Sequence, residues 1–82
     1  MKVQDILTDE SKWCKGAFPD IHGQRCLAGA VLDAYSGTPD ISYIMNKLRY
    51  RFGFERNAIS GWNDAPERTF SEVRALIEEL DI

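Results

Sequence analysis

The sequence predicts a mainly α-helical protein, a compact single-domain bundle of three main helices with a short N-terminal helix and ordered loops. Three observations predict this fold class. Apolar residues recur at helical spacing in separate segments, and glycines, prolines and capping residues lie between those segments. The length of 82 residues leaves room for one hydrophobic core. One domain is therefore expected over residues 1–82, folding by itself or as a small oligomer.

The N-terminal segment opens with three apolar residues at helical spacing: Val3, Ile6 and Leu7. With Trp13 further on, this spacing predicts a short helix that ends before Gly16. Residues 15–24 contain two glycines and a proline among polar residues, a composition typical of a structured loop. Phe18 and Ile21 are expected to hold this loop against the core.

The first main helix is expected over residues 26–36, followed by Gly37 as its stop. Its apolar positions follow the i, i+3, i+4, i+7, i+8 rule: Leu27, Ala30, Val31, Ala34 and Tyr35. The second main helix is expected over residues 39–52, with Thr38 as N-cap, Pro39 at the first helical position and Gly53 at the end. Its apolar stripe comprises Ile41, Ile44, Met45, Leu48 and Phe52. Charged and apolar residues alternate over residues 47–54, so a strand remains an alternative there.

The last main helix is expected over residues 69–80, because Thr69 and Glu72 form a capping box before an apolar stripe. The stripe comprises Phe70, Val73, Leu76, Ile77 and Leu80. Before it, residues 55–60 could form one helical turn, followed by a non-helical turn over residues 61–66. Acidic residues crowd the C-terminal end of the last helix, where the helix dipole disfavours them: Glu78, Glu79 and Asp81. This end is either frayed or faces a basic partner.

Composition excludes several function classes. The apolar fraction of 44% is ordinary for a soluble globular protein, and no continuous apolar run indicates a membrane span or a secretory signal. A formal charge of −3 disfavours general binding of nucleic acid. Two cysteines, Cys14 and Cys26, are fewer than disulfide scaffolds carry, so we expect reduced thiols in a cytoplasmic protein. A Cys14–Cys26 bridge stays open as an alternative.

Catalytic and metal sites find little support. Cys14, His22 and Cys26 would need a fourth zinc ligand such as Asp20, and their spacing matches no common zinc module. A nucleophilic triad of Cys14, His22 and Asp64 has the required residue types, but nothing in the sequence brings them together. We therefore predict no catalytic residue, no metal site and no cofactor.

Two loops concentrate the residue types suited to binding, and the candidate binding residues are Trp13, Lys15, Trp62, Asn63, Asp64 and Arg68. If the loops meet, the indoles would form the floor of a site and the polar groups its rim. The structural alternative makes the tryptophans core anchors, lets Asn63 and Asp64 bond local amides, and pairs Arg68 with Asp64.

A second candidate surface is basic and aromatic. It comprises Lys47, Arg49, Arg51 and Arg56, interleaved with Tyr50, Phe52 and Phe54. Such a cluster could contact phosphates and stack on bases, or it could meet an acidic protein surface. The alternative without a binding role is that these residues form the solvent-exposed side of a helix.

The sequence contains three motifs within residues 3–80: W-x-x-G-A from Trp13, C-L-x-G-A from Cys26, and W-N-D-x-P-x-R-T-x-x-E-V from Trp62. In these motifs it resembles a family of small uncharacterised bacterial and phage proteins. The resemblance implies a shared fold and a bacterial or phage origin, and it carries no activity. We therefore expect a non-catalytic binding module that acts on a partner protein, which for a phage member would be a host or defence protein. The alternatives are a small-ligand site or enzyme built from the Trp13 and Trp62 loops, and nucleic-acid contact through residues 47–56.

Overall fold

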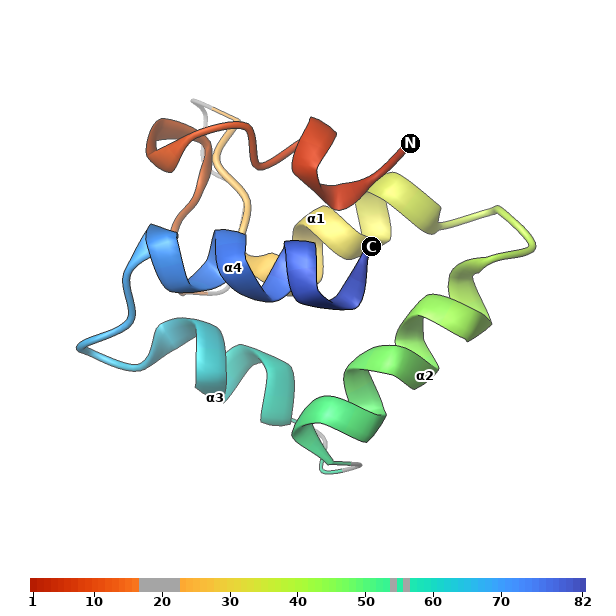
Figure 1. Ribbon diagram of the computed structural model, residues 1–82. Helices are drawn as coiled ribbons and strands as arrows, with labels where there is room; N and C mark the ends of the chain where they lie inside the picture. Colours follow the sequence, from red (N-terminus) through yellow and green to blue (C-terminus); the bar gives the residue numbers. More distant parts are fainter. Residues whose placement is uncertain (17–22, 54, 56) are drawn as a thin grey trace.

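Four α-helices and two short 3-10 helices make up the computed structural model, which describes residues 1–16, 23–53, 55 and 57–82 (Figure 1). In chain order the elements are η1 (Val3–Asp5), η2 (Glu10–Lys12), α1 (Leu27–Tyr35), α2 (Ile41–Phe52), α3 (Ala58–Asp64) and α4 (Phe70–Leu80). The mainly α prediction is confirmed. The expected loop anchors Phe18 and Ile21 lie outside the described residues.

The N-terminal segment is not the single helix that the apolar spacing predicts. It forms η1 and η2 instead, and the side chain of Asp9 starts η2 by accepting the amide N–H of Ser11 at 2.9 Å. Val3 and Leu7 are nevertheless buried, because one 3-10 turn suffices to direct both side chains into the core. Trp13 follows in extended conformation and forms an isolated parallel bridge with Arg25.

Helix α1 agrees with its prediction. Cys26 is its N-cap, and the thiol sulfur accepts the amide N–H of Gly29 at 3.4 Å. Ser36 is the C-cap, and Gly37 has a φ of 80°, a left-handed conformation in which glycine carries no steric penalty.

Helix α2 starts two residues later than predicted. Thr38 does not cap it, because its hydroxyl donates to the carbonyl of Tyr35 at 2.7 Å, and Asp40 occupies the N-cap position. The strand alternative is wrong for the described part of residues 47–54, since the helix continues to Phe52 before Gly53 ends it with a φ of 98°. Phe54 and Arg56 of the predicted cluster lie outside the described residues.

Helix α3 corrects the turn predicted over residues 61–66. The helix begins at Ala58 and includes Gly61, whose amide donates to the carbonyl of Asn57 at 2.8 Å. It ends only after Asp64, where Ala65 is extended ahead of Pro66. The turn prediction failed because the side chains of Asn63 and Asp64 bond distant segments, which leaves the local backbone free to stay helical.

Helix α4 has the predicted capping box. Thr69 Oγ1 accepts the Glu72 amide at 3.3 Å, and Glu72 Oε1 accepts the Thr69 amide at 3.1 Å. The acidic C-terminal end meets basic groups of the same chain. Asp81, in left-handed conformation, pairs with Lys2, and Glu79 lies 3.6 Å from Arg51.

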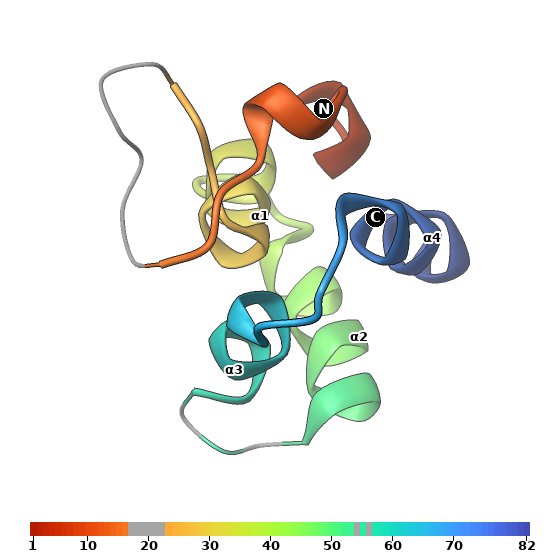
Figure 2. The ribbon, with the colours of Figure 1, turned by 90° about the vertical axis from the view of Figure 1, so that its left-hand side faces the viewer.

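The core lies between α4, α1, α2 and the N-terminal segment, in a molecule of 28 × 23 × 21 Å (Figures 1 and 2). Its apolar residues are Val3, Leu7, Trp13, Leu27, Ala30, Val31, Ala34, Tyr35, Ile44, Leu48, Phe70, Val73, Leu76, Ile77 and Ile82. The N-terminal segment lies on one side of α4 and α3 on the other (Figures 1 and 2), and α1 contacts η1, α2 and α3. None of the helices in the described part of the chain combines the length and apolar character needed to cross a bilayer.

Candidate functional site

The two tryptophan segments of the sequence, around Trp13 and around Trp62, lie beside one another. Asn63 connects them, although it is the only polar residue among the described ones that is fully buried, with 0% exposure. Its Oδ1 accepts the indole N–H of Trp13 at 2.7 Å and the amide N–H of Leu27 at 3.1 Å. Its Nδ2 donates to the carbonyl of Cys14 at 3.2 Å and to Asp64 Oδ1 at 2.8 Å. A primary amide has two N–H donors and two acceptor lone pairs. All four hydrogen bonds of the Asn63 side chain are made to other groups of the protein.

Lys15 and Asp64 also connect the Trp13 segment to α3, through contacts that are exposed to solvent. The Lys15 ammonium donates to the carbonyls of Ala65 and Pro66 at 2.7 and 2.9 Å, where the chain leaves α3. Asp64 Oδ1 accepts the amide N–H of Gly16 at 2.9 Å. A cation at the C-terminal end of a helix satisfies carbonyls that lack helical partners. The predicted Asp64–Arg68 pair is wrong, because Asp64 is directed toward Gly16 and Asn63.

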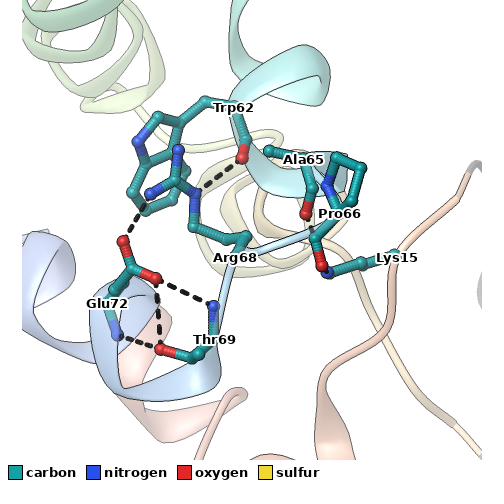
Figure 3. A network of polar contacts seen from close by, with 7 residues as sticks. All are labelled: Lys15, Trp62, Ala65, Pro66, Arg68, Thr69 and Glu72. Atoms are coloured by element: carbon teal, nitrogen blue, oxygen red, sulfur yellow. Dashed lines mark hydrogen bonds and ion pairs between the residues drawn. The ribbon is translucent and has the colours of Figure 1, made fainter.

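Arg68 belongs to a second cluster with Trp62 and Glu72 (Figure 3). Its Nε donates to the carbonyl of Trp62 at 2.8 Å, its Nη1 donates to Glu72 Oε2 at 2.6 Å, and its guanidinium carbon lies 4.1 Å from the centre of the Trp62 ring. Trp62 also contacts Phe52, with ring centres 5.3 Å apart and the ring planes tilted by 44°. Arg68 is therefore a stacked, hydrogen-bonded guanidinium with an exposed side-chain fraction of 17%.

Glu72 is held ionised by this cluster. The hydrogen bond from the Thr69 amide lowers the pKa of the Glu72 carboxyl below its ordinary value, and the guanidinium of Arg68 lowers it further. Both carboxylate oxygens are occupied, Oε1 by Thr69 and Oε2 by Arg68. The capping box and the arginine stack thus share one carboxylate.

An open cavity of about 390 Å³ lies next to the second cluster, between α2, α3 and α4. It is lined by Arg51, Trp62, Arg68, Glu72, Ala75, Leu76 and Glu79. Trp62, Ala75 and Leu76 provide apolar surface, and the four charged residues surround it. The cavity can accept a side chain or small group that carries both apolar and charged atoms.

The six candidate binding residues therefore fall into two neighbouring groups. Trp13, Lys15, Asn63 and Asp64 form the junction around Asn63, whereas Trp62 and Arg68 belong to the stacked cluster. The polar atoms of the first group are directed at the protein itself, an arrangement that joins segments of the fold. A binding role for the six residues stays a hypothesis.

Two tyrosines are the aromatic side chains most exposed to solvent in the described chain, and the basic and aromatic cluster predicted from the sequence contains only one of them, Tyr50. Tyr43 is 62% exposed and Tyr50 is 85% exposed, both on α2. The signal was present in the sequence, because the two tyrosines are seven positions apart and lie on one face of a helix. The sequence prediction grouped Tyr50 with the basic cluster and did not pair it with Tyr43.

The cysteines and the histidine give no site within the described residues. Cys14 and Cys26 are both thiols and half-buried. His22 and Asp20, which the zinc and triad hypotheses require, lie outside the described residues. Within the part of the chain that the structure describes, no group of three potential ligand residues lies close enough to hold a metal ion.

Comparison with known proteins places the chain in a family without an assigned activity. A family model described as "Family of unknown function (DUF6197)" matches residues 1–80. No curated protein and no solved structure matches the chain significantly. The match covers nearly the whole domain and agrees with the resemblance to an uncharacterised family. The chain is a member of the DUF6197 family of unknown function.

Proposed function

We propose that this chain is a non-catalytic domain that binds a partner protein, and that the exposed face of α2 is its binding surface. The observation that supports the proposal is the pair of solvent-exposed tyrosines, Tyr43 and Tyr50, on one rigid helix. Tyrosine is enriched in protein interfaces, because its ring buries a large apolar area with little loss of conformational entropy and its hydroxyl still hydrogen-bonds.

The geometry of α2 makes the tyrosines one surface. At 100° per residue, Tyr43 and Tyr50 point in directions that differ by about 20°, with Lys47 between them. Ile44 and Leu48 are turned about 100–160° away from the tyrosines and are buried in the core. The tyrosines therefore lie on a helix that is held in place by the packing of its buried residues in the core. We name this surface, formed by Tyr43, Asn46, Lys47 and Tyr50, the α2 face.

Lys47 fixes part of the α2 face. Its ammonium donates to the carbonyl of Leu80 at 2.8 Å and lies 4.9 Å from the centre of the Tyr43 ring. The hydrogen bond to the end of α4 limits the rotamers of Lys47, and the cation–π contact limits those of Tyr43. A surface ordered before binding loses less entropy on association than a flexible one.

The proposal includes the remaining expectations from the sequence: a bacterial or phage origin, action in the cytoplasm, and for a phage member a host or defence protein as partner. A small-ligand or enzymatic site at the Trp13 and Trp62 loops is less well supported, because the polar atoms of Lys15, Asn63 and Asp64 already bond protein groups. Nucleic acid would use the same α2 face and is an outcome of the test.

The test is selection from a random dodecapeptide library displayed on phage, followed by calorimetry with the enriched peptides. Replacing both Tyr43 and Tyr50 by alanine should weaken binding at least about tenfold, because exposed aromatic anchors contribute much of interface affinity. Leu32→Ala, a matched change at an apolar α1 residue that is 52% exposed, should leave binding unchanged. Peptides that bind the double variant as well as the wild type would contradict the proposal, as would tighter binding of an oligothymidine than of every peptide.

A further inference from the structure

We infer that the partner presents an acidic segment, and that one of its carboxylates enters the cavity between α2, α3 and α4 to meet Arg51 and Arg68. This inference rests on the proposed function and names the chemistry of the partner. Three features carry it: the charge of α2, the position of the cavity at the C-terminal end of α2, and the unoccupied donors of the two arginines.

The charge of α2 is opposite to that of the whole chain. The net charge of the protein is −3, but Ile41–Phe52 contains three cationic residues and no acidic residue: Lys47, Arg49 and Arg51. Helix α2 is therefore a local positive region on an acidic protein. Complementary charge is what orients partners at an interface and excludes wrong ones, so an acidic segment fits α2.

The cavity adjoins the C-terminal end of α2 at Arg51. Arg51 follows Tyr50 in the last turn of α2 and also lines the cavity. Lys47 lies one turn earlier and reaches the end of α4, the helix that forms the far wall of the cavity. A partner segment that continues past Tyr50 to the end of α2 reaches the cavity at Arg51.

Arg68 offers a fixed donor in the cavity. Stacking on Trp62 and the bonds from Nε and Nη1 hold its guanidinium in place (Figure 3). Its Nη2 has no hydrogen-bond partner among the described residues. A guanidinium whose position is already fixed can bind a carboxylate without first losing rotamer freedom.

Arg51 offers the second donor. Its Nε lies 3.6 Å from Glu79 Oε2, which is longer than a hydrogen bond, and within the described chain its Nη atoms have no hydrogen-bond partner. Glu72 also lines the cavity, and its two carboxylate oxygens accept bonds from Thr69 and Arg68. Glu79 is the group that an incoming carboxylate displaces, and a long, exposed ion pair of this kind is weak.

The experiment titrates the ¹⁵N-labelled full chain with acetyl-hexaglutamate amide and follows side-chain N–H signals by NMR. The Trp62 indole N–H and the Nε–H signals of Arg51 and Arg68 should shift and saturate. The Trp13 indole N–H, bonded to the buried Asn63, should stay in place and report that the fold is intact. Acetyl-hexaglutamine amide, the neutral probe of the same length, should shift none of them.

Charge variants test the assignment of donors. Arg51→Gln should weaken hexaglutamate binding about tenfold, and Glu79→Gln should strengthen it severalfold because the competing carboxylate is gone. Arg74→Gln is the matched control, since it removes the same charge from α4 but lines a different cavity, beside Gln4 and Glu78. Equal weakening by Arg51→Gln and Arg74→Gln would overturn the inference, because it would show attraction to overall charge rather than to the cavity.

Two further outcomes separate this inference from the proposed function. If library peptides bind through Tyr43 and Tyr50 but carry no acidic residue, and hexaglutamate leaves Trp62 unshifted, the inference fails while the proposed function stands. If hexathymidylate shifts Trp62 and Arg51 at lower concentration than hexaglutamate, the cavity binds phosphate in preference to carboxylate and both proposals are overturned.

Discussion

The indole N–H of Trp13 donates to the side-chain oxygen of Asn63 at 2.7 Å, across 50 residues of sequence. The same oxygen accepts the Leu27 amide, the first amide of α1. The side-chain oxygen of Asn63 thereby accepts one N–H from the N-terminus of α1 and one from the buried Trp13 indole. These bonds join the N-terminal segment, α1 and α3. The packing of these three segments thus depends on a residue from the stretch that the sequence analysis interpreted as a binding loop.

Asn63→Leu should destabilise the protein by more than about 2 kcal/mol. The substitution leaves the N–H groups of Trp13 and Leu27 buried without their acceptor, and each such group costs about 1–3 kcal/mol. Urea unfolding followed by circular dichroism measures the change. Asn46→Leu, at an exposed position of α2, should stay within about 0.5 kcal/mol of wild type. Equal stability of the two variants would show that water replaces the lost partners.

Lys15→Ala should lower the free energy of unfolding by about 0.5–1.5 kcal/mol, because two carbonyls at the end of α3 lose their donor. Lys12→Ala removes the same charge from an exposed residue and should have little effect. Thermal melts of both variants make the comparison. An unchanged melting temperature for Lys15→Ala, together with weaker binding of library peptides, would instead support the binding site proposed for the two tryptophan loops.

Thr69→Ala should cost about 0.5–2 kcal/mol, because the amide of Glu72 loses its N-cap acceptor. Ser71→Ala, two residues into the same helix at an exposed position, serves as the control and should be neutral or slightly stabilising. Urea midpoints of the two variants test the capping box separately from helix propensity.

Stability should decrease as the pH falls below about 4.5, in part through Glu72. The Thr69 amide and Arg68 lower the pKa of Glu72 in the folded state, so the unfolded chain binds the proton more tightly. The contribution is therefore complete above the pKa of the unfolded state and is lost as the pH falls through the pKa of the folded state. Glu72→Gln should make the unfolding free energy less dependent on pH between 3 and 5, as measured by urea unfolding at several pH values. A slope identical to that of wild type would show that Glu72 does not contribute.

A second pH effect arises at the chain ends. The hydrogen bond to Asp81 raises the pKa of Lys2, and the same contact lowers the pKa of Asp81. The contribution of Lys2 is complete below its pKa in the unfolded state and is lost as the pH rises through its pKa in the folded state. Lys2→Gln should therefore remove part of the stability loss seen above about pH 10. Because both side chains are exposed, salt should weaken the effect.

Periodicity predicted the helices whose buried faces it could identify. Leu27, Val31, Leu48 and Val73 are all fully buried, as their spacing requires. It failed at the boundaries where side chains bond elsewhere. The hydroxyl of Thr38 donates to the carbonyl of Tyr35 and does not cap α2. Asp9 accepts the amide N–H of Ser11 and begins η2, so the N-terminal segment is not one helix.

The sequence predicted which residues the candidate site contains, but it did not predict which of them contact one another. The sequence pointed to the segments that contain Trp13 and Asn63, because tryptophan, amide and guanidinium groups are concentrated there. It paired Arg68 with Asp64, whereas Arg68 stacks on Trp62 and bonds Glu72. Sequence spacing gives the residues within reach, but several acceptors lie within reach of one arginine.

The sequence by itself determined the helical class, the capping box at Thr69 and the apolar faces of α1, α2 and α4, because these depend on residues three or four positions apart. Only the tertiary structure decided that Asn63 is a buried hub, that Lys15 caps α3, and that Arg51 and Arg68 face one cavity. Those relationships join residues up to about 50 positions apart, and their partners are selected by the packing of helices. Local pattern fixes which face of a helix is buried, whereas the donor that meets each acceptor is fixed only when the helices assemble.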